Sequence, residues 1–350
     1  MLKSKNKFGH QFSYVDRLEE KMKKNFITAA FAAALTCSAS FAANAAELRL
    51  SHQWSTKDVR HKVAQMVADH VAAADVDLSI KIFPSKSLFK PREQYKPLSR
   101  GQLDMSVFPL SYAGGQRPEF NLTLMPGLVK NHDHAARLNK SEFMGDIQKL
   151  MEEDDVKVMV HGYLAGGFVG KEKCITKPDD VKGLQTRAAG KAFEQMLASA
   201  GASIASMASS EIYNAMQTGV LQAANTSSSS FASYRIFEQV KCYTPASDFA
   251  LWFMYQPMLI NKSSYDNLND AQKAALDEGA KKAEAFYLAE AKKQDAASVE
   301  EFKAAGVEIA NMTQEEFAAW QAVAKESSYK KFVEDVPGGQ ALLDKALSVE

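Results

Sequence analysis

The longest regular segment of the sequence begins at Leu268 and ends at Gly306, and it is rich in alanine and charged residues. Asn269 or Asp270 at its start is a good helix cap, and Gly306 is a typical helix end. The pattern predicts one helix of about 35 residues, roughly 50 Å long at 1.5 Å per residue. A single compact domain has little use for a helix of this length, whereas a protein of two lobes can place such a helix across both. The sequence therefore predicts two lobes.

Strand and helix patterns alternate upstream of this helix. Leu48 and Leu50 alternate with polar residues as in a strand, and Val59, Val63 and Val67 then recur at helical spacing. Similar alternation continues along the chain, as is typical of an α/β protein with two mainly parallel sheets.

Two segments are suited to cross between the lobes as hinge strands, the glycine-rich run 162–170 and the long apolar run 249–261. The expected boundaries of the lobes follow from these crossings. We expect lobe I to contain residues 46–165 and 253–292, and lobe II to contain residues 166–252 and 293–350.

The N-terminal region carries the pattern of a Sec-type signal peptide. Residues 1–21 precede Met22. Two lysines follow Met22, and after them come an apolar run from Phe26 to Leu35 and a stretch of small residues that ends at Ala45. We expect residues 1–45 to be removed and the mature chain to reach the periplasm. Removal takes away seven of the 42 basic and three of the 42 acidic residues, which leaves a net charge of −4. That balance does not favour nucleic acid or an anionic membrane surface as a partner.

Two cysteines, Cys174 and Cys242, remain after the expected processing. In an exported bacterial chain an even pair favours a disulfide. The alternative is two unpaired buried thiols.

The sequence lacks the common signatures of catalysis. It has no GxSxG nucleophile elbow, no P-loop, no HExxH pair and no GxGxxG behind a strand. His132 and His134 have a spacing that metal sites use, but no cysteine or carboxylate cluster accompanies them, and a polar helix start is the simpler interpretation. We expect no enzyme activity, no cofactor and no metal site.

Arg187 is the side chain that most suggests a ligand. On the strand predicted around it, Arg187 points to the same side as Gln185 and away from Leu184 and Thr186. A planar guanidinium group grips a carboxylate through two parallel hydrogen bonds. The alternative is a solvated or salt-bridged arginine at a strand end.

Several segments resemble the periplasmic substrate-binding proteins of TRAP (tripartite ATP-independent periplasmic) transporters, the DctP-like family. The resemblance covers essentially all of 47–345. It rests on IFPSKSL, GQLDMSVFPLSY and LMPGL, and above all on KPDDVKGLQTRAAG (177–190), AGASIASMASSEIYNAMQTGVLQAANTSSSSF (200–231) and WFMYQPMLINKSSYDNLNDAQKAAL (252–276).

The resemblance implies a two-lobed periplasmic-binding-protein-like fold, with crossing hinge strands and a long helix that spans both lobes. It also implies a monomeric receptor that closes on a small organic carboxylate and delivers it to a TRAP membrane permease. In this family an arginine at the position of Arg187 holds the ligand carboxylate by a two-point salt bridge. Many members carry a second arginine where this chain has Val169, in the sequence Gly167-Phe168-Val169. A monocarboxylate, either a 2-oxo, a 2-hydroxy or an aromatic acid, is therefore the expected ligand.

Further residues are expected to line the cleft between the lobes, because ligands bind at strand ends in open α/β sheets. The alternative for Trp54 and Tyr213 is ordinary core packing. By composition NTSSSSF (225–231) indicates a linker, but its anchored ends favour cleft lining for 225–227 and a helix cap at Ser228 and Ser229. The expected ligand contacts besides Arg187 are Gln53, Trp54, Tyr112, Phe168, Tyr213, Asn225, Thr226, Ser227 and Trp252.

Two other functions remain possible for the same scaffold. One is a sensing module that reports ligand binding to a signalling partner. The other is an enzyme, because a fold does not fix a function. The sequence shows no nucleophile and base pair for the second alternative.

Overall fold

The protein is described by a computed structural model that covers residues 46–247 and 249–350. The expected signal peptide, within residues 1–45, lies outside the described residues. Among the helices that are described, none combines the length and the apolar character that a membrane span requires.

Lobe I is built on a five-stranded sheet with the strand order β2-β1-β3-β11-β4. Strand β1 runs parallel to β2 and β3, whereas β11 runs antiparallel to β3 and β4. The bounds of these strands are β1 (Ala46–Ser51), β2 (Leu78–Phe83), β3 (Met105–Val107), β4 (Val156–Val160) and β11 (Met258–Asn261).

The helices of lobe I cover this sheet. In α2 the apolar stripe predicted from the sequence is buried, and the Asp58 side chain caps the helix by accepting a hydrogen bond from Arg60 N. The helices are α2 (Val59–Ala73), α3 (Tyr95–Ser99), α4 (His132–Leu138), α5 (Glu142–Glu153) and α9 (Lys262–Asp266), with short 3₁₀ turns η1 (Pro91–Glu93), η2 (Leu110–Ala113) and η3 (Pro118–Leu124).

Lobe II is built on a seven-stranded sheet with the order β12-β9-β5-β8-β6-β7, in which β10 also pairs with β5. The central strand β5 is glycine-rich because its neighbours approach closely. A Cβ atom at Gly166 would lie 1.9 Å from the carbonyl oxygen of Thr226, and one at Gly167 would lie 1.9 Å from that of Thr244. The strands are β5 (Tyr163–Gly170), β6 (Gln185–Ala188), β7 (Ser203–Ser206), β8 (Ala223–Ser227), β9 (Cys242–Thr244), β10 (Trp252–Tyr255) and β12 (Glu308–Ile309).

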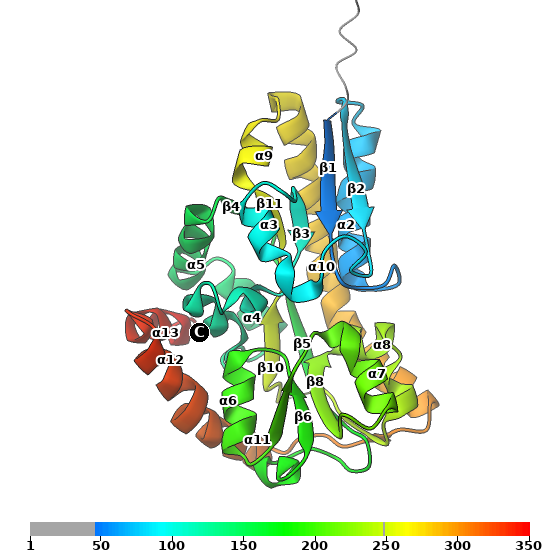
Figure 1. The fold of residues 1–350 in the computed structure, drawn as a ribbon, viewed down its shortest axis with the longest axis vertical. Helices are drawn as coiled ribbons and strands as arrows, with labels where there is room; N and C mark the ends of the chain where they lie inside the picture. Colours follow the sequence, from blue (N-terminus) through cyan, green and yellow to red (C-terminus); the bar gives the residue numbers. More distant parts are fainter. Residues whose placement is uncertain (1–45, 248) are drawn as a thin grey trace, which may run out of the picture. The chain divides into compact units, whose positions relative to one another are not determined.

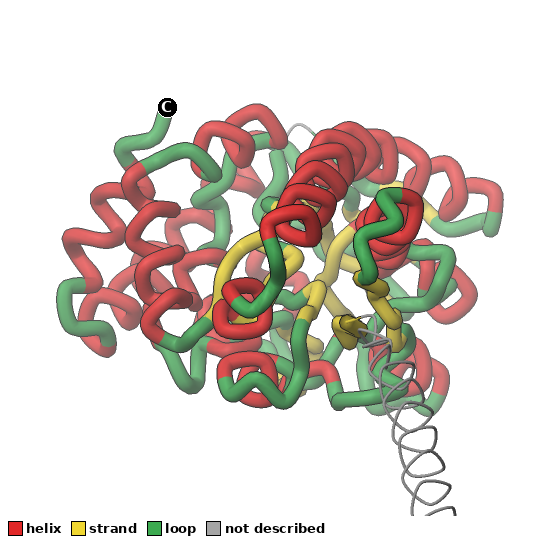
Figure 2. The backbone as a smooth tube through the Cα atoms, turned by 90° about the horizontal axis from the view of Figure 1, so that it is seen from above, coloured by secondary structure: helices red, strands yellow, loops and turns green. Residues whose placement is uncertain are grey.

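Helices also pack against the second sheet. Seen from above, strands of the molecule lie inside and helices outside (Figure 2). The helices of lobe II are α6 (Lys191–Ser199), α7 (Ile212–Gln217) and α8 (Ser228–Ser233), with the 3₁₀ turns η4 (Pro178–Val181), η5 (Ser209–Glu211) and η6 (Ile236–Gln239). The C-terminal helices run from lobe II back to lobe I, where α13 packs on α5 and Lys345 pairs with Asp146. They are α11 (Gln314–Ala324), the π-helical turn η7 (Lys325–Tyr329), α12 (Lys330–Asp335) and α13 (Gly339–Leu347).

Two chain crossings and one helix join the lobes. Strand β4 of lobe I leads directly into β5 of lobe II, and β10 of lobe II leads into β11 of lobe I. The expected single strand 249–261 is divided at Gln256 and Pro257, because proline has no N–H for a strand ladder. Helix α10 (Asp270–Ala304) begins after the cap Asn269 and packs against α2 of lobe I and α8 of lobe II (Figure 1).

The predicted two-lobed α/β fold, with its crossing strands and long helix, is confirmed. The sheets, however, are mixed and not mainly parallel. The reason is that β5 and β11, which enter their sheets from the other lobe, and β10, which leaves lobe II, run antiparallel to all their neighbours.

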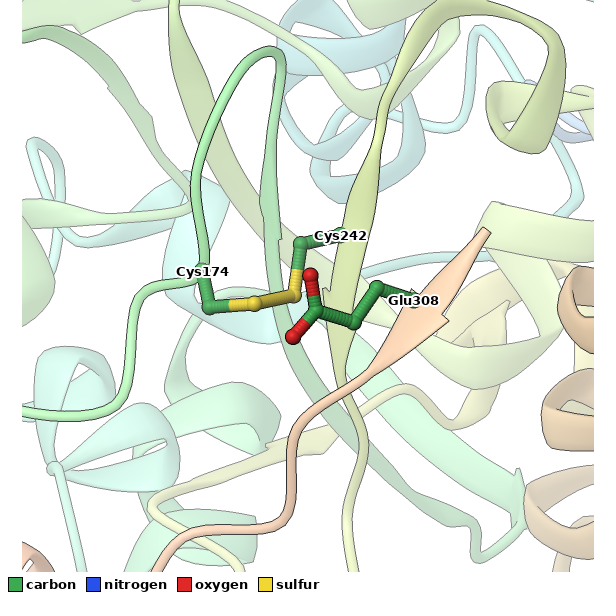
Figure 3. Close-up of side chains that lie close together, drawn as sticks. All are labelled: Cys174, Cys242 and Glu308. Atoms are coloured by element: carbon green, nitrogen blue, oxygen red, sulfur yellow. A yellow bond between two sulfur atoms is a disulfide. The ribbon is translucent and has the colours of Figure 1, made fainter. Parts of the chain in front are cut away.

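The predicted disulfide between Cys174 and Cys242 is present and joins the loop after β5 to β9. Figure 3 shows the Glu308 carboxylate of β12 beside the two sulfur atoms. Because both sulfurs are bonded to each other, they are not thiolate ligands, and this group is not a metal site.

Reduction of the disulfide is expected to destabilise the protein. A cross-link between residues separated by 68 positions stabilises by about 4 kcal/mol on loop-entropy grounds, because it restricts the unfolded chain. The Cys174→Ser/Cys242→Ser variant should therefore melt at a lower temperature in a calorimetric scan, as should the protein in dithiothreitol. Dithiothreitol should not lower the melting temperature of the variant further. Equal melting temperatures for the oxidised and reduced protein would contradict the prediction.

Candidate functional site

Arg187, near the end of β6, lies between the two lobes and is 1% exposed. Its Nε donates to the carbonyl oxygen of Met207 at 3.1 Å, and Nη1 donates to that of Asn225 at 2.5 Å. Its Nη2 donates across the lobes to the Tyr112 hydroxyl at 2.9 Å. These bonds use three of the five N–H groups of the guanidinium. One N–H remains on each of Nη1 and Nη2, the pair that can hold both oxygens of a carboxylate.

The charge of Arg187 is not balanced by a nearby carboxylate. Within the described part of the chain, no carboxylate oxygen lies within 4.0 Å of its nitrogens, so no salt bridge is formed. Burial lowers the pKa of Arg187 below its usual value, and the neighbouring charge of Arg92 acts in the same direction. A buried cation without a counter-ion is unfavourable, so the position favours an anion.

Arg92, in η1 of lobe I, brings a second guanidinium to the same place. Its Cζ lies 4.5 Å from the centroid of the Tyr112 ring, and its Nη2 donates at 3.4 Å to the carbonyl oxygen of Met207 that also accepts from Arg187. Its buried Nε has no hydrogen-bond partner in the described residues. Arg92 was not predicted, because a single arginine after Pro91 in a surface-like KPRE segment carries no signal of its own.

Tyr112 is held between these two cations. Its hydroxyl oxygen accepts from Arg187 and from the Ser209 N–H at 3.2 Å. Burial alone raises the pKa of Tyr112, but the charges of Arg187 and Arg92 and the Ser209 N–H outweigh it and lower the pKa below the usual value. The site is therefore strongly electropositive.

The loop after β1 supplies further polar groups from lobe I. The Oγ of Ser209, in lobe II, donates to Gln53 Oε1 at 3.4 Å. The buried side-chain nitrogens Gln53 Nε2 and Trp54 Nε1 lack partners among residues 46–247 and 249–350, as does Ser111 Oγ. Unsatisfied buried donors are unfavourable, so a polar ligand beside them would be stabilised.

The segment 225–230 is wholly buried, and its residues have different contacts. Both polar atoms of the Asn225 side chain lack partners in the part of the chain that is described. Ser227, and not Ser228 or Ser229, caps α8 by accepting from Ser230 N at 3.1 Å. The expected cap at Ser228 and Ser229 was wrong, because β8 extends to Ser227 and the helix starts one residue later. Thr226 is the last interior residue of β8 before this cap.

Three of the predicted contacts belong to other elements of lobe II, and Phe168 of β5 lies opposite Asn225 in the pairing of β5 with β8. Phe168 stacks on Trp320 of α11 with ring centroids 5.5 Å apart. Tyr213, on α7, is half-buried and donates to Glu238. Trp252 lies in β10 opposite Gly166, and its buried Nε1 has no partner within the described residues. The structure thus brings together Gln53, Tyr112, Arg187 and Asn225, with Trp54 beside Gln53.

His52 fixes the loop that carries Gln53 and Trp54. Its Nδ1 accepts from Trp54 N at 3.2 Å, and its Nε2 lies 3.1 Å from Nδ1 of His61. Burial, followed by the proximity of His61, lowers the pKa of His52 from 6.5 to about 3. The neutral ring is therefore the form that the folded loop requires.

Comparisons with known proteins agree with this arrangement. Residues 50–335 match the family described as bacterial extracellular solute-binding protein, family 7. A solute-binding protein of Albidiferax ferrireducens is 32% identical over 296 residues, which are 83% of this chain and 88% of that protein.

Solved structures give the same result. A TRAP periplasmic solute-binding protein from Rhodoferax ferrireducens, crystallised with bound malonate, is similar with a TM-score of 0.83 and 32% identity, over 86% of this chain and 98% of that one. A Bordetella pertussis extracytoplasmic solute receptor that binds pyroglutamic acid is similar in fold, with a TM-score of 0.79 and 20% identity, over 86% of this chain and 99% of that one.

The neutral His52 ring predicts a loss of stability in acid. Between pH 6.5 and about 3 the unfolded chain binds a proton at His52 that the folded chain does not bind. Stability conferred by the neutral ring is therefore complete above pH 6.5 and falls as the pH decreases towards 3. The lowered pKa values of His61, His134 and His161 act in the same direction. The His52→Gln variant should show a shallower decrease in melting temperature over this range, and equal slopes for the two proteins would refute the assignment.

Proposed function

Because the chain belongs to family 7 of the bacterial extracellular solute-binding proteins, the TRAP periplasmic solute-binding proteins, we propose that it binds a small organic monocarboxylate and delivers it to a TRAP membrane permease. The family is non-catalytic and binds solutes without transforming them. The proposed ligand is a 2-oxo, 2-hydroxy or aromatic acid. It is held between the lobes, with its carboxylate on Arg187.

The observation that carries this proposal is the state of the Arg187 guanidinium. It is buried, it has no carboxylate partner within the described residues, and it keeps one N–H free on each terminal nitrogen. A carboxylate placed there gains two parallel, charge-assisted hydrogen bonds and neutralises a buried charge. Gln53, Asn225 and Trp54 supply the donors and acceptors for the rest of the ligand, and Tyr112 orients Arg187.

Delivery requires the ligand to be released as well as bound. The groups around Arg187 come from both lobes, since Tyr112 and Gln53 belong to lobe I while Arg187 and Asn225 belong to lobe II. A ligand that contacts both sets stabilises the closed arrangement, because it makes more contacts there than with the lobes apart. Separation of the lobes removes the contacts with one of the two sets. We place the receptor in the periplasm, after removal of residues 1–45, where the permease is accessible.

A second candidate is a small dicarboxylate, and Arg92 favours it. The guanidinium groups of Arg92 and Arg187 lie beside Tyr112, and neither has a carboxylate partner in the described chain. Such a site is suited to two negative charges. The relative that is 32% identical over 86% of this chain carries malonate, a dicarboxylate. The candidates share Arg187 and differ in whether Arg92 contacts an anionic group.

Loss of the Arg187 guanidinium is expected to abolish most of the affinity. A thermal-shift screen of organic acids identifies ligands, since they stabilise the folded protein by mass action, and calorimetry then gives their affinities. Arg187→Ala should weaken binding of such an acid by about 2–5 kcal/mol, because the carboxylate loses a desolvated charge pair. Arg187→Lys should retain part of the affinity, since it keeps the charge but not the two-point geometry.

The matched control for Arg187 is Arg117→Ala. Arg117 is half-buried and paired with Asp154 and Glu153, apart from the group around Arg187, and its loss should leave the affinity unchanged. Wild-type affinity in Arg187→Ala would exclude the proposed carboxylate grip.

Arg92 separates the two candidate ligand classes. If the ligand is a dicarboxylate, Arg92→Ala should weaken malonate binding at least tenfold more than pyruvate binding, because only malonate has a second carboxylate to lose its partner. If the ligand is a monocarboxylate, both acids should lose affinity by the same factor. Titration calorimetry at constant ionic strength measures both affinities, and the ratio between them decides between the classes.

A further inference from the structure

Asp58 and Arg60 form an ion pair that is buried at the junction of the lobes. The Arg60 Nε and Nη2 donate to the two carboxylate oxygens of Asp58, each at 2.6 Å. Both side chains are 1% exposed or less. Burial alone lowers the pKa of Arg60, but Asp58 outweighs it and raises the pKa above its usual value. A buried ion pair is least costly when the remaining hydrogen-bonding groups of both partners are also satisfied.

The pair belongs to lobe I, but its remaining hydrogen bonds go to other parts of the molecule. Arg60 Nη1 donates to Ser227 Oγ at 3.3 Å, and Nη2 donates to Ser230 Oγ at 3.0 Å. Ser233 Oγ donates to Asp58 Oδ2 at 2.7 Å. All three serines lie at the β8–α8 junction of lobe II. We call the group of Asp58, Arg60, Ser227, Ser230 and Ser233 the interlobe clasp.

Arg60 differs from Arg187 in having no free donor. Its Nη1 also donates to Gln256 Oε1 at 2.8 Å, in the crossing between β10 and β11. With the two bonds to Asp58 and the two to serines, all five N–H groups are used. Its Cζ lies 4.0 Å from the centroid of the Trp54 ring, so the guanidinium also covers one face of that side chain. Arg60 is therefore saturated by the protein and has no N–H to offer a ligand.

We propose that the interlobe clasp sets the equilibrium between open and closed lobes, independently of which ligand is bound. Separation of the lobes breaks the three bonds to serines, whereas the bonds within lobe I remain. Hydrogen bonds to charged groups are among the stronger ones, so each favours the closed arrangement. Asp58, Arg60 and the serines act as positioning residues. The role of this equilibrium in binding rests on the proposed function, because affinity scales with the fraction of binding-competent protein.

The closed population can be measured without any ligand by an engineered cross-link. A Cβ atom at Gly190, in lobe II, would lie 3.5 Å from the Cβ of Ser111, in lobe I. This distance suits a disulfide, whose Cβ atoms lie about 3.5–4.5 Å apart. The backbone of Gly190 is extended, with φ −166° and ψ 173°, so another residue fits there. In a Ser111→Cys/Gly190→Cys parent, the rate of cross-linking under mild oxidation reports how often the lobes close.

The clasp is tested by adding Ser230→Ala/Ser233→Ala to this parent. The substitutions remove two of the three bonds that the clasp makes between the lobes and leave both charged residues and the Ser227 cap in place. We expect cross-linking to slow about tenfold, the effect of roughly 1.4 kcal/mol from two bonds to charged groups. Peptide mapping confirms that the new cross-link forms between positions 111 and 190 while the native disulfide stays intact.

The matched control is Ser228→Ala/Ser229→Ala. These serines lie in the same buried run, but Ser228 Oγ bonds only within lobe II, to the Ala165 carbonyl oxygen, and Ser229 Oγ has no partner in the described structure. The control should cross-link at the parent rate. Equal rates in the clasp variant and the parent would overturn the proposal, as would equal slowing in the control.

A parent that does not cross-link would contradict the closed geometry on which the clasp depends. Because the measurement contains no acid and leaves Arg187 unchanged, its outcome is separate from that of the binding experiments. A negative cross-linking result would overturn the clasp without bearing on carboxylate binding. A negative binding result would overturn the proposed function without changing the cross-linking result.

Discussion

The site depends on one unpaired buried charge. Arg187 is surrounded by carbonyl oxygens and a hydroxyl group, which orient the guanidinium without neutralising it. An anion placed beside it would offset the unfavourable burial of this charge, whereas an uncharged solute would not. The two crossing strands and α10 hold the lobes so that Tyr112 from one side meets Arg187 from the other. The architecture thus places an unpaired cation between the lobes.

The two buried arginines show how the same side chain performs different tasks. All five N–H groups of Arg60 donate to side chains of the protein, whereas Arg187 keeps two N–H groups free. Counting N–H groups distinguishes them although both are 1% exposed. Arg92, with its unpartnered Nε and its contact with the Tyr112 ring, resembles Arg187 more than Arg60.

Local sequence signals predicted the parts of this fold that depend on neighbouring residues. The cap at Asn269 and the length of α10 follow from helix chemistry, and the pairing of Cys174 with Cys242 follows from the number of cysteines in an exported chain. Arg187 was identified because strand alternation and a family resemblance agreed. Arg60 and Arg92 were not predicted, because the partners that connect them to lobe II are distant in the sequence. Met207 lies 115 positions from Arg92, and Ser227 and Ser230 lie 167 and 170 positions from Arg60. The cap of α8 was misplaced because a run of four serines gives no local signal for where the strand ends.

The disulfide has a consequence for how the protein is produced in the laboratory. The cross-link joins β9 to the loop that leaves β5, and β5 is the central strand of lobe II. Thiols stay reduced in the bacterial cytosol and are oxidised in the periplasm. Material expressed inside the cell without a leader would therefore lack a native covalent bond in the lobe that carries Arg187. Recombinant samples made in this way and those made by secretion are chemically different proteins.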